Sequence, residues 1–336
     1  MLEKLINNII LPIINLILFI DKGSWREKKI NVFVRGILFI PLKKLRKIRR
    51  EHKFVENQYD QIAGSYIRDN YYQGKERFSV VDGGIKKIDS IENMKKIRIE
   101  INNILKEIKF NSVLEIGVGE LTSLEAIYRE FGPDLDCYGI DLSFNRVYHG
   151  LAEFNQKYNK VPRIAKADAT MLPFPDNSID LVYTRHTLEQ MPTIFEKALD
   201  EIFRVAKNNI ILFEPSYELG SLTQKIKMID SDYVRGIPKY INNKNDVKLN
   251  DMFLMQNSAN PLNHTACFKI NMEKSLKNKS ITRPINFVCP YTRTKLVEKD
   301  GYLFSPKANR AYTIIEDIPI LDPEYSVILT KPQKYK

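Results

Sequence analysis

Cysteine is scarce in this chain of 336 residues: only Cys137, Cys267 and Cys289 occur, and they lie far apart in the sequence. An odd and widely spaced set argues against a disulfide framework and fits a reducing compartment. Hydrophobic residues make up 43% of the chain, so a sizeable core can form and the composition is globular. The length suits one full domain with appendages.

An even spread of positive charge is also missing, although the net charge is +11. Twelve lysines and arginines but only three acidic residues lie between Asp21 and Lys53, whereas the rest of the chain is nearly neutral. A nucleic-acid-binding protein would show basic residues mixed with aromatic ones around its binding surface. The distribution therefore disfavours a nucleic-acid partner.

The N-terminus lacks the small-residue cleavage site of a secretory signal, although residues 1–20 are strongly apolar. Three asparagines and Pro12 also make this run a poor membrane-spanning helix. A second apolar run, residues 30–42, ends at the basic cluster KKLRKIRR. An apolar helix beside dense positive charge is typical of an anchor on an anionic membrane surface, which we predict for residues 1–53. The alternative is that both runs pack on the following domain as ordinary helices.

Strand and helix patterns alternate between residues 112 and 214. We expect strands at 112–116, 137–140, 163–166, 179–184 and 209–214, and helices at 122–131, 143–158 and 192–205. Ahead of them, residues 78–89 are expected to form a loop and residues 90–109 an amphipathic helix. Strands separated by helices predict an α/β fold whose parallel sheet is covered on both faces. Residues 218–280 show a mixed pattern that indicates no particular element.

A strand that runs into a glycine turn, VLEIGVGE from Val113 to Glu120, is the first candidate binding element. Gly117 and Gly119 allow the backbone to pass close to a ligand at the start of a helix. The third glycine of a dinucleotide fingerprint is missing, and Glu115 and Glu120 would disfavour a pyrophosphate. A cofactor with a cationic amino-acid part suits these carboxylates.

Two acidic residues follow the next two strands. Asp141 ends the run YGID about 22 residues after Gly119, where a carboxylate can accept hydrogen bonds from both ribose hydroxyls. Asp168, in the run ADA, follows the third strand, where an adenine amino group would lie. Asp141 alone would suit NAD as well, and the second carboxylate favours S-adenosylmethionine.

The chain resembles class I S-adenosylmethionine-dependent methyltransferases of the type 11 family. Four runs carry the resemblance, in the order of the family's motifs: VLEIGVGE, GIDLS, ADATMLPFPDNSIDLVYTRHTLEQM and EIFRVAKNNIILFEP. The resemblance implies a Rossmann-like, seven-stranded, mostly parallel sheet with helices on both faces. It implies that the methionine part of the cofactor lies near Glu115, Gly117 and Gly119, the ribose at Asp141, the adenine beside Leu142, Asp168 and Ala169, and the sulfonium near Arg185 and His186. Glu120 departs from the family, in which glycine or cysteine is commoner at this position.

The upstream run YDQIAGSY is similar to the short helix that often covers the cofactor in this superfamily, so Tyr59 and Tyr66 are expected to close over the site as a lid.

Catalysis needs few residues, because a sulfonium methyl is highly electrophilic and the enzyme mainly aligns the reacting atoms. A base is required only if the acceptor is a hydroxyl that loses its proton during transfer. The candidate catalytic residues are His186, Glu189 and His264, and Glu214 is a further carboxylate after the fifth strand. Structural roles stay open for both histidines. Gln190 stands where many relatives carry a histidine, which disfavours a histidine-based mechanism at that position.

The C-terminal residues resemble a small zinc-ribbon-like domain found beside some methyltransferases. The resemblance is carried by Cys289-Pro290, the run SPKANRAYTI from Ser305 and the run IPIL from Ile318. The family pattern has four cysteines, which would hold zinc, but Thr292, Ser305 and Ala308 replace three of them. We therefore predict a β-rich module without a metal site.

Three parts are expected: the apolar and basic segment 1–53, the methyltransferase domain 54–280, and the β-rich module 281–336. The N-terminal segment favours a membrane-proximal acceptor, such as a glycan, a lipid or a surface-polysaccharide precursor. It also favours a cytoplasmic protein that is peripheral at the inner face of the membrane. One alternative is an RNA methyltransferase, because the C-terminal module is related to partners of tRNA methyltransferases. Another alternative is a non-catalytic scaffold protein. The presence of both Asp141 and Asp168 argues against it.

Overall fold

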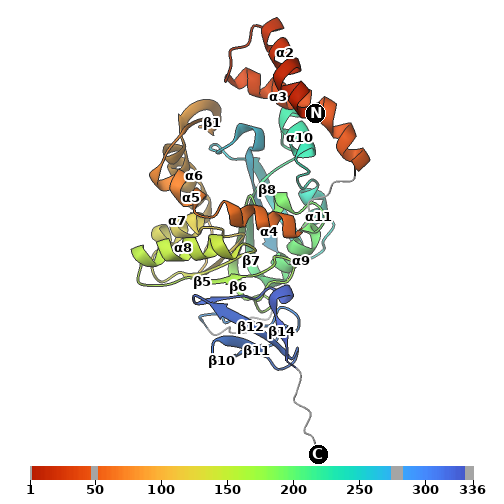
Figure 1. The fold of residues 1–336 in the computed structure, drawn as a ribbon. Helices are drawn as coiled ribbons and strands as arrows, with labels where there is room; N and C mark the ends of the chain where they lie inside the picture. The colour runs from red at the N-terminus through yellow and green to blue at the C-terminus, as the bar shows by residue number, and fades with distance from the viewer. Residues whose placement is uncertain (1, 47–51, 274–282, 330–336) are drawn as a thin grey trace, which may run out of the picture.

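The computed structural model describes residues 2–46, 52–273 and 283–329, and its centre is a seven-stranded sheet (Figure 1). The strand order is β5-β4-β3-β6-β7-β9-β8, and only β9 runs antiparallel to its neighbours. The strands are β3 (Ser112–Ile116), β4 (Asp136–Asp141), β5 (Arg163–Lys166), β6 (Ile179–Arg185), β7 (Ala206–Pro215), β8 (Val247–Leu254) and β9 (Thr265–Met272). The predicted Rossmann-like fold is therefore confirmed.

Both faces of the sheet are buried, because alternate side chains of each strand point to opposite sides. On one face, Val113 and Leu181 pack with α6 (Ser90–Lys106), α7 (Thr122–Phe131) and α8 (Phe144–Lys157). On the other face, Leu114 and Val182 pack with α9 (Phe195–Val205) and α11 (Ile237–Asn242). The near-continuous apolar strands of the sequence reflect this two-sided burial.

Residues 76–89 form a hairpin, so the prediction of a loop at 78–89 was wrong. Its strands are β1 (Glu76–Val81) and β2 (Gly84–Asp89). Asp82 and Gly83 connect them with φ angles of 50° and 75°, the left-handed conformation that a two-residue hairpin turn requires. The glycines therefore mark the turn of a hairpin. Asp89 then caps α6 by accepting hydrogen bonds from the backbone N–H groups of Ile91 and Glu92.

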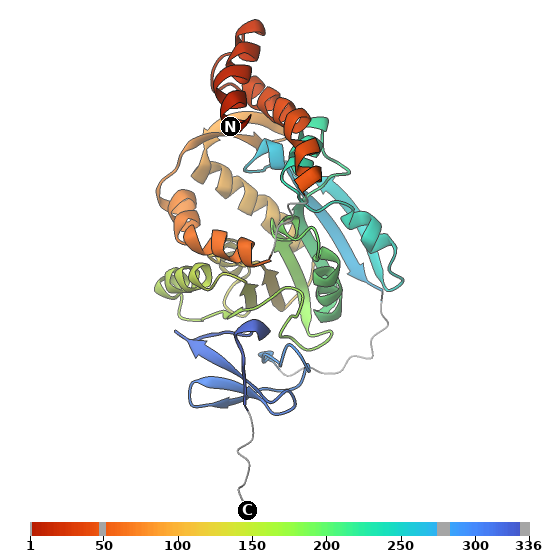
Figure 2. The same ribbon diagram turned by 45° about the vertical axis from the view of Figure 1, so that its right-hand side comes forward.

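The N-terminus forms a helical hairpin that projects from one end of the molecule (Figures 1 and 2). Its first arm is α1 (Leu2–Leu5), η1 (Ile6–Ile10) and α2 (Leu11–Ile17), and its second arm is α3 (Trp25–Arg46). α3 packs on α10 (Leu222–Asp230) so closely that a Cβ atom at Gly36 would lie 2.2 Å from Ile226 Cγ2. Lys47, Arg49 and Arg50 of the predicted basic cluster lie outside the described residues.

In the described part of the chain, no helix combines the length and the apolar character needed to cross a membrane.

Residues 283–329 form a separate β module at the opposite end of the molecule (Figure 2). Its strands are β10 (Val297–Lys299), β11 (Tyr302–Ser305), β12 (Arg310–Ile315), β13 (Ile318–Pro319) and β14 (Val327–Ile328). The module packs on the face of the main sheet beside β5, where the connection 167–178 contains no helix. The backbone N–H of Leu321 donates to the carbonyl of Lys166 at 2.7 Å, and Phe287 packs on Phe174.

The module gathers three of the four positions that the zinc-ribbon resemblance assigns to cysteines. The hydroxyls of Thr292, Ser305 and Tyr312 hydrogen-bond to the buried Cys289 thiol and hold its pKa below the usual value, although burial alone would raise it. Within residues 2–46, 52–273 and 283–329, no group of three or more His, Cys, Asp or Glu side chains could hold a metal ion. The zinc-ribbon origin of the module stays a prediction.

Candidate functional site

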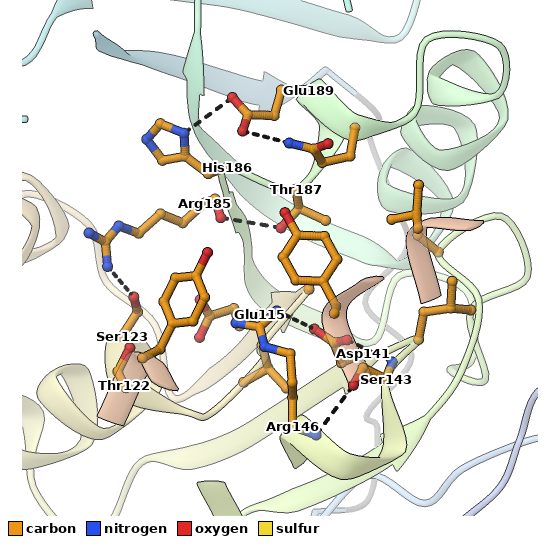
Figure 3. A pocket seen from close by; sticks show the side chains of 18 of the residues that line it. Glu115, Thr122, Ser123, Asp141, Ser143, Arg146, Arg185, His186, Thr187 and Glu189 are labelled. Atoms are coloured by element: carbon orange, nitrogen blue, oxygen red, sulfur yellow. Dashed lines mark hydrogen bonds and ion pairs between the residues drawn. The ribbon is translucent and has the colours of Figure 1, made fainter. Parts of the chain in front are cut away.

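A cavity of about 740 Å³ opens at the carboxyl ends of β3, β4 and β6 (Figure 3). Parallel strands place the loops that follow them at one edge of the sheet, which is the usual ligand site of this architecture. The helices α4 (His52–Gln61), α5 (Ser65–Ile67) and η2 (Arg68–Tyr72) cover the cavity, and the hairpin β1–β2 and the segment 259–265 complete its wall. One end holds most of the predicted cofactor residues, and the other holds two of the three predicted catalytic residues, His186 and Glu189.

The glycine turn lies where the sequence predicts it, between β3 and α7. Gly117 and Gly119 have φ angles of 74° and 52°. A Cβ atom at Gly117 would lie 2.2 Å from Thr187 Oγ1, whose hydroxyl donates to the Ile116 carbonyl at 3.0 Å. Glycine is therefore required at Gly117 both for its conformation and for its close contact with the loop after β6.

Asp141 ends β4 and faces the cavity from below the glycine turn. Its Oδ2 accepts from the Gly119 backbone N–H at 2.8 Å, and its Oδ1 accepts from the Ser143 N–H at 2.8 Å. These bonds fix the side chain, and each carboxylate oxygen keeps a second acceptor position. The arrangement fits a ribose with two hydroxyls.

The predicted adenine residues are brought together only in part. Leu142, Ala167 and Ala169 line the cavity and form an apolar slot beside Asp141. Asp168 is absent from this lining, and its Oδ1 accepts hydrogen bonds from the N–H of Thr170 at 2.7 Å and from its hydroxyl at 2.9 Å. The contact of Asp168 with an adenine amino group stays a prediction.

Glu115 is a buried acid at the floor of the cavity. Burial raises its pKa to about 8, although the Tyr183 hydroxyl donates to its Oε2 at 2.7 Å and Arg185 is nearby. A neutral acid in this position can ionise when a cationic group arrives beside it. Glu115 therefore suits the ammonium of an amino-acid cofactor, as the sequence indicates.

The expected lid is in place above these residues. Tyr59 and Tyr66 line the cavity, and the Arg146 guanidinium lies 5.0 Å and 4.7 Å from the centres of their rings. The buried Glu120 carboxylate accepts from the backbone N–H groups of Gly64 at 3.1 Å and Ile67 at 2.7 Å. The residue that departs from the family pattern thus connects the glycine turn to the lid.

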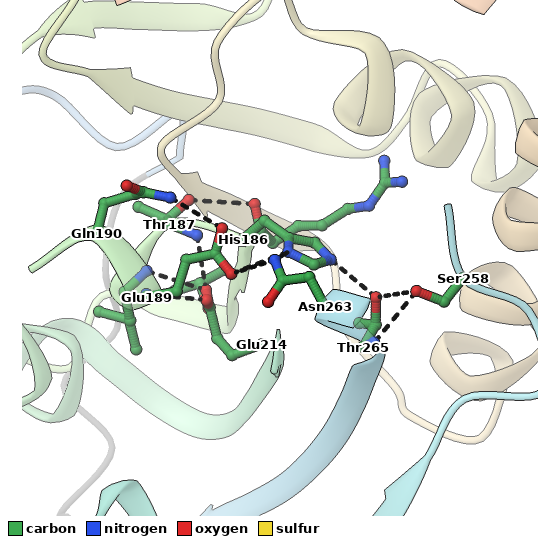
Figure 4. Close-up of polar contacts among 11 residues, drawn as sticks. His186, Thr187, Glu189, Gln190, Glu214, Ser258, Asn263 and Thr265 are labelled. Atoms are coloured by element: carbon green, nitrogen blue, oxygen red, sulfur yellow. Dashed lines mark hydrogen bonds and ion pairs between the residues drawn. The ribbon is translucent and has the colours of Figure 1, made fainter. Parts of the chain in front are cut away.

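The other end of the cavity contains His186, whose ring is held on both sides (Figure 4). Nδ1 of His186 lies 3.2 Å from Glu189 Oε2, and Nε2 lies 2.8 Å from Thr265 Oγ1. Asn263 donates to Glu189 Oε2 at 2.8 Å and Gln190 donates to Oε1 at 2.9 Å, so the carboxylate is fixed. Burial would lower the pKa of His186, but the charge and hydrogen bond of Glu189 outweigh it and raise the pKa above 6.5.

Glu214 and His264 have different surroundings from His186. Glu214 is fully buried, and its two oxygens accept from the Thr184 hydroxyl and from three backbone N–H groups, those of residues 187–189. It therefore shapes the loop that carries His186. His264 lies outside the cavity lining, and its Nε2 is 2.7 Å from the Met255 carbonyl oxygen. The structure does not bring His264 together with His186.

A cluster of three buried charged side chains and one exposed tyrosine, which sequence reasoning missed, joins the lid to the C-terminal module. We call it the clasp and define it as Glu56, Lys166, Asp322 and Tyr325. Nζ of Lys166 lies 3.0 Å from Glu56 Oε1 and 3.3 Å from Asp322 Oδ2. The Tyr325 hydroxyl donates to Glu56 Oε1 at 3.0 Å, and the ammonium lies 4.1 Å from the centre of the tyrosine ring. In the sequence, Lys166 was the one indication of this cluster, because a charged residue at the end of a buried strand needs a partner of opposite charge.

Comparisons with known proteins agree with this geometry. Residues 114–213 match a family model described as a methyltransferase domain. The chain is 30% identical over 96 residues to phosphoethanolamine N-methyltransferase 2 of Caenorhabditis elegans, and 29% identical over 99 residues to demethylmenaquinone methyltransferase of Anoxybacillus flavithermus. These matches cover 29% and 30% of this chain, and 21% and 41% of those proteins. The chain thus spans less than half the length of these two curated relatives.

A solved structure shares the fold. Magnesium protoporphyrin IX methyltransferase from Synechocystis, with bound S-adenosylhomocysteine, superimposes with a TM-score of 0.51 at 14% sequence identity. The match covers 66% of this chain and all of that chain. The family match and the shared fold agree with the methyltransferase domain and the S-adenosylmethionine site expected from the sequence. The residues fit this cofactor, since Glu115 is a buried acid suited to its ammonium and Asp141 keeps acceptor positions for its ribose.

Proposed function

We propose that this protein transfers a methyl group from S-adenosylmethionine to a hydroxyl of a membrane-proximal acceptor, such as a glycan, a lipid or a surface-polysaccharide precursor. The observation that carries the proposal is the pair His186 and Glu189 inside the cavity that contains the cofactor residues. A hydroxyl acceptor needs a base, and a histidine with a raised pKa beside a fixed carboxylate supplies one.

In this proposal, each end of the cavity has its own task. Glu115 and the glycine turn hold the methionine part, Asp141 holds the ribose, and Leu142 with Ala169 encloses the adenine. The lid residues Tyr59 and Tyr66 exclude water from the sulfonium, whose methyl group is the electrophile that the cofactor supplies when bound. Arg185 and His186 then lie at the floor where the acceptor enters.

His186 would take the acceptor proton while the acceptor oxygen bonds to the methyl carbon and the methyl–sulfur bond breaks, leaving its electron pair on the sulfur. Glu189 accepts the hydrogen bond from Nδ1–H, so the unprotonated Nε2 is directed toward Thr265 Oγ1 and the cavity. An acceptor hydroxyl that replaces the Thr265 contact would lie within reach of Nε2. Glu189 also stabilises the imidazolium that results, since the two groups are 3.2 Å apart.

The N-terminal hairpin supports an acceptor at a membrane surface. Its tip exposes large apolar side chains, with Leu16 74% and Phe19 92% accessible, and lysines and arginines flank them. The start of α3 contacts the β1–β2 hairpin, which forms part of the cavity wall: the ring centres of Trp25 and Phe78 are 5.9 Å apart, and Phe78 lies on β1. The hairpin could therefore dock on anionic lipid while it holds the cavity wall close to the surface.

The decisive experiment follows a labelled methyl group. Purified protein and radiolabelled S-adenosylmethionine are added to fractions of total lipid, lipid-linked glycan and RNA. Label in the lipid or glycan fraction, lost with the variant Asp141→Ala and reduced with His186→Asn, is the expected result. Label in RNA alone, or label unchanged by both variants, would overturn the proposal.

A further inference from the structure

We infer that the acceptor is an anion, and that Arg77 and Arg185 bind its phosphate or carboxylate group inside the cavity. The inference rests on the proposed function, since it names the substrate class of the same site. It starts from three arginines on neighbouring elements: Arg77 on β1, Arg98 on α6 and Arg185 at the end of β6.

Arg77 enters the cavity wall from the hairpin. It lines the cavity, and its Nε is buried without a hydrogen-bond partner. Side chains two positions apart on a strand share a face, and the hydroxyl of Ser79 donates to the carbonyl of Ala259 at 3.3 Å. Arg77 therefore points to the side of β1 that faces Ala259 and Asn260, which also line the cavity.

Arg185 lies across the floor and extends away from Asp141 toward Ser123 (Figure 3). Its Nη1 donates to Ser123 Oγ at 2.7 Å, and its Nη2 lies 3.6 Å from the sulfur of Met94. These partners are neutral, so they leave the positive charge without a counterion. The charge of Glu115 would raise the pKa of Arg185, but burial raises the pKa of Glu115 itself to about 8, so this acid is largely protonated at neutral pH.

Arg98 strengthens the positive potential behind these two residues. It is 6% exposed, its Nε and Nη2 have no hydrogen-bond partner, and its guanidinium lies 4.2 Å from the centre of the Tyr71 ring. Burial lowers the pKa of Arg185, and the charge of Arg98 lowers it further. In the described residues, no carboxylate lies within 4.0 Å of Arg77, Arg98 or Arg185, although most other buried cations of the domain are paired.

Buried guanidinium groups without carboxylate partners are costly unless a ligand supplies the negative charge. An arginine fork matches the oxygens of phosphate and carboxylate in a bidentate way. The cofactor has one carboxylate of its own, but Arg77 stands on the hairpin, away from the strand ends that carry the glycine turn and Asp141. An anionic group bound by Arg77 would therefore belong to the acceptor and not to the cofactor.

The test uses full-length protein saturated with S-adenosylhomocysteine, so that the cofactor carboxylate is already in place. Inorganic phosphate and acetate are titrated at constant ionic strength by calorimetry. The variants are Arg77→Gln and Arg185→Gln, with Arg77→Lys to retain the charge. The matched control is Arg163→Gln, because Arg163 lies at the amino end of β5 and bonds to Asn286 outside the cavity.

Saturable binding of phosphate or acetate to the wild-type complex is expected. The affinity should fall roughly tenfold or more in both glutamine variants, recover in part in Arg77→Lys, and stay unchanged in the control. The anion with the higher affinity identifies the group. If phosphate binds better, glycerol 3-phosphate and vesicles of phosphatidic acid then distinguish a soluble phosphomonoester from a lipid headgroup.

Several results would overturn the inference: no anion binding to the complex, equal binding by all variants, or loss of S-adenosylhomocysteine affinity in Arg185→Gln with phosphate affinity intact. The last result would assign Arg185 to the cofactor carboxylate. Failure of the wild-type protein to bind S-adenosylhomocysteine at all would instead contradict the proposed function.

Discussion

The carboxylate of Glu120 accepts a hydrogen bond from the backbone N–H of Ile67 at 2.7 Å, across 53 residues of sequence. This bond fastens the lid to the glycine turn, because Gly64 and Tyr66 donate to the same carboxylate from the start of α5. An acid at the beginning of a helical segment satisfies N–H groups that have no partner within the helix. The departure of Glu120 from the family pattern is thereby explained by a structural role.

Replacement of Glu120 should loosen the lid without touching the cofactor directly. In Glu120→Ala, three backbone N–H groups lose their acceptor, and we expect the affinity for S-adenosylmethionine to fall about tenfold. Calorimetric titration measures this affinity, and Glu130→Gln serves as a surface control because Glu130 lies away from the lid and pairs with the exposed Lys106. Equal affinity in Glu120→Ala and the control would contradict the role of Glu120 in lid closure.

Cofactor binding should depend on pH through Glu115. Its pKa is raised from 4.5 to about 8, so the carboxyl group holds a proton below pH 8 and must release it when the cationic cofactor binds. The affinity should therefore rise between about pH 5 and pH 8, by at most about tenfold per pH unit, and level off above pH 8. Calorimetry in buffers of different ionisation enthalpy measures whether a proton is released when the cofactor binds.

The variant Glu115→Gln tests whether Glu115, and not another titrating group, causes the pH dependence of cofactor binding. It should bind the cofactor weakly and lose the pH dependence. The stability of the free protein changes in the opposite direction: a raised acid pKa means that stability is lost as pH rises from 4.5 toward 8, and the glutamine variant should not show this loss. Identical pH profiles of wild type and variant would rule out Glu115 as the titrating group.

The base role of His186 predicts a characteristic pH–rate profile. Only the unprotonated imidazole can take a proton, so kcat/KM should rise with pH through an apparent pKa above 6.5. His186→Asn should lower kcat about 100-fold or more and flatten this limb, and Glu189→Gln should shift the limb to lower pH because it removes the charge that raises the pKa. His264→Asn, whose side chain lies outside the cavity lining, should leave the profile unchanged.

The clasp should contribute to stability and to cofactor binding together. Lys166 is 4% exposed and neutralises two buried carboxylates, so Lys166→Met should destabilise the protein by about 3–5 kcal/mol. Denaturant unfolding measures this loss. The exposed Lys160 is a suitable control, and Lys160→Met should change the free energy of unfolding by less than about 1 kcal/mol.

The clasp also makes a second, distinct prediction. Asp322→Asn keeps the shape of the side chain but removes a charge on the C-terminal module, and it should weaken S-adenosylmethionine binding because Glu56 belongs to the lid. Wild-type cofactor affinity in a folded Asp322→Asn variant would limit the clasp to stability.

The N-terminal hairpin should bind anionic vesicles. The triple variant Leu16→Ser, Ile17→Ser and Phe19→Ser removes the most exposed apolar side chains of the tip and should abolish flotation with phosphatidylglycerol vesicles. The matched control, Ile99→Ser with Val161→Ser, removes exposed apolar residues elsewhere and should float like wild type. Equal flotation of both variants, or no flotation of wild type, would remove the support for a membrane-proximal acceptor.

The amino-acid sequence by itself determined the sheet, the glycine turn and the position of Asp141. These features depend on local patterns: apolar runs of strand length, a turn that needs glycine, and an acid at the end of the next strand. It also indicated His186 and Glu189, because residues that follow a parallel strand gather at one edge of the sheet. Such inferences require only that the strands lie side by side in the expected order.

The tertiary structure alone decided the contacts between distant segments. It converted residues 78–89 into a hairpin that brings Arg77 to the cavity, placed His264 outside the cavity, and joined Glu56 to Tyr325 across 269 residues. The periodicity of a sequence does not show which charged side chains pair, since the partner of a buried charge is set by the packing of elements far apart in the chain. The lysine at the end of β5 signalled that a partner must exist, and only the folded chain showed that it joins the lid to the C-terminal module.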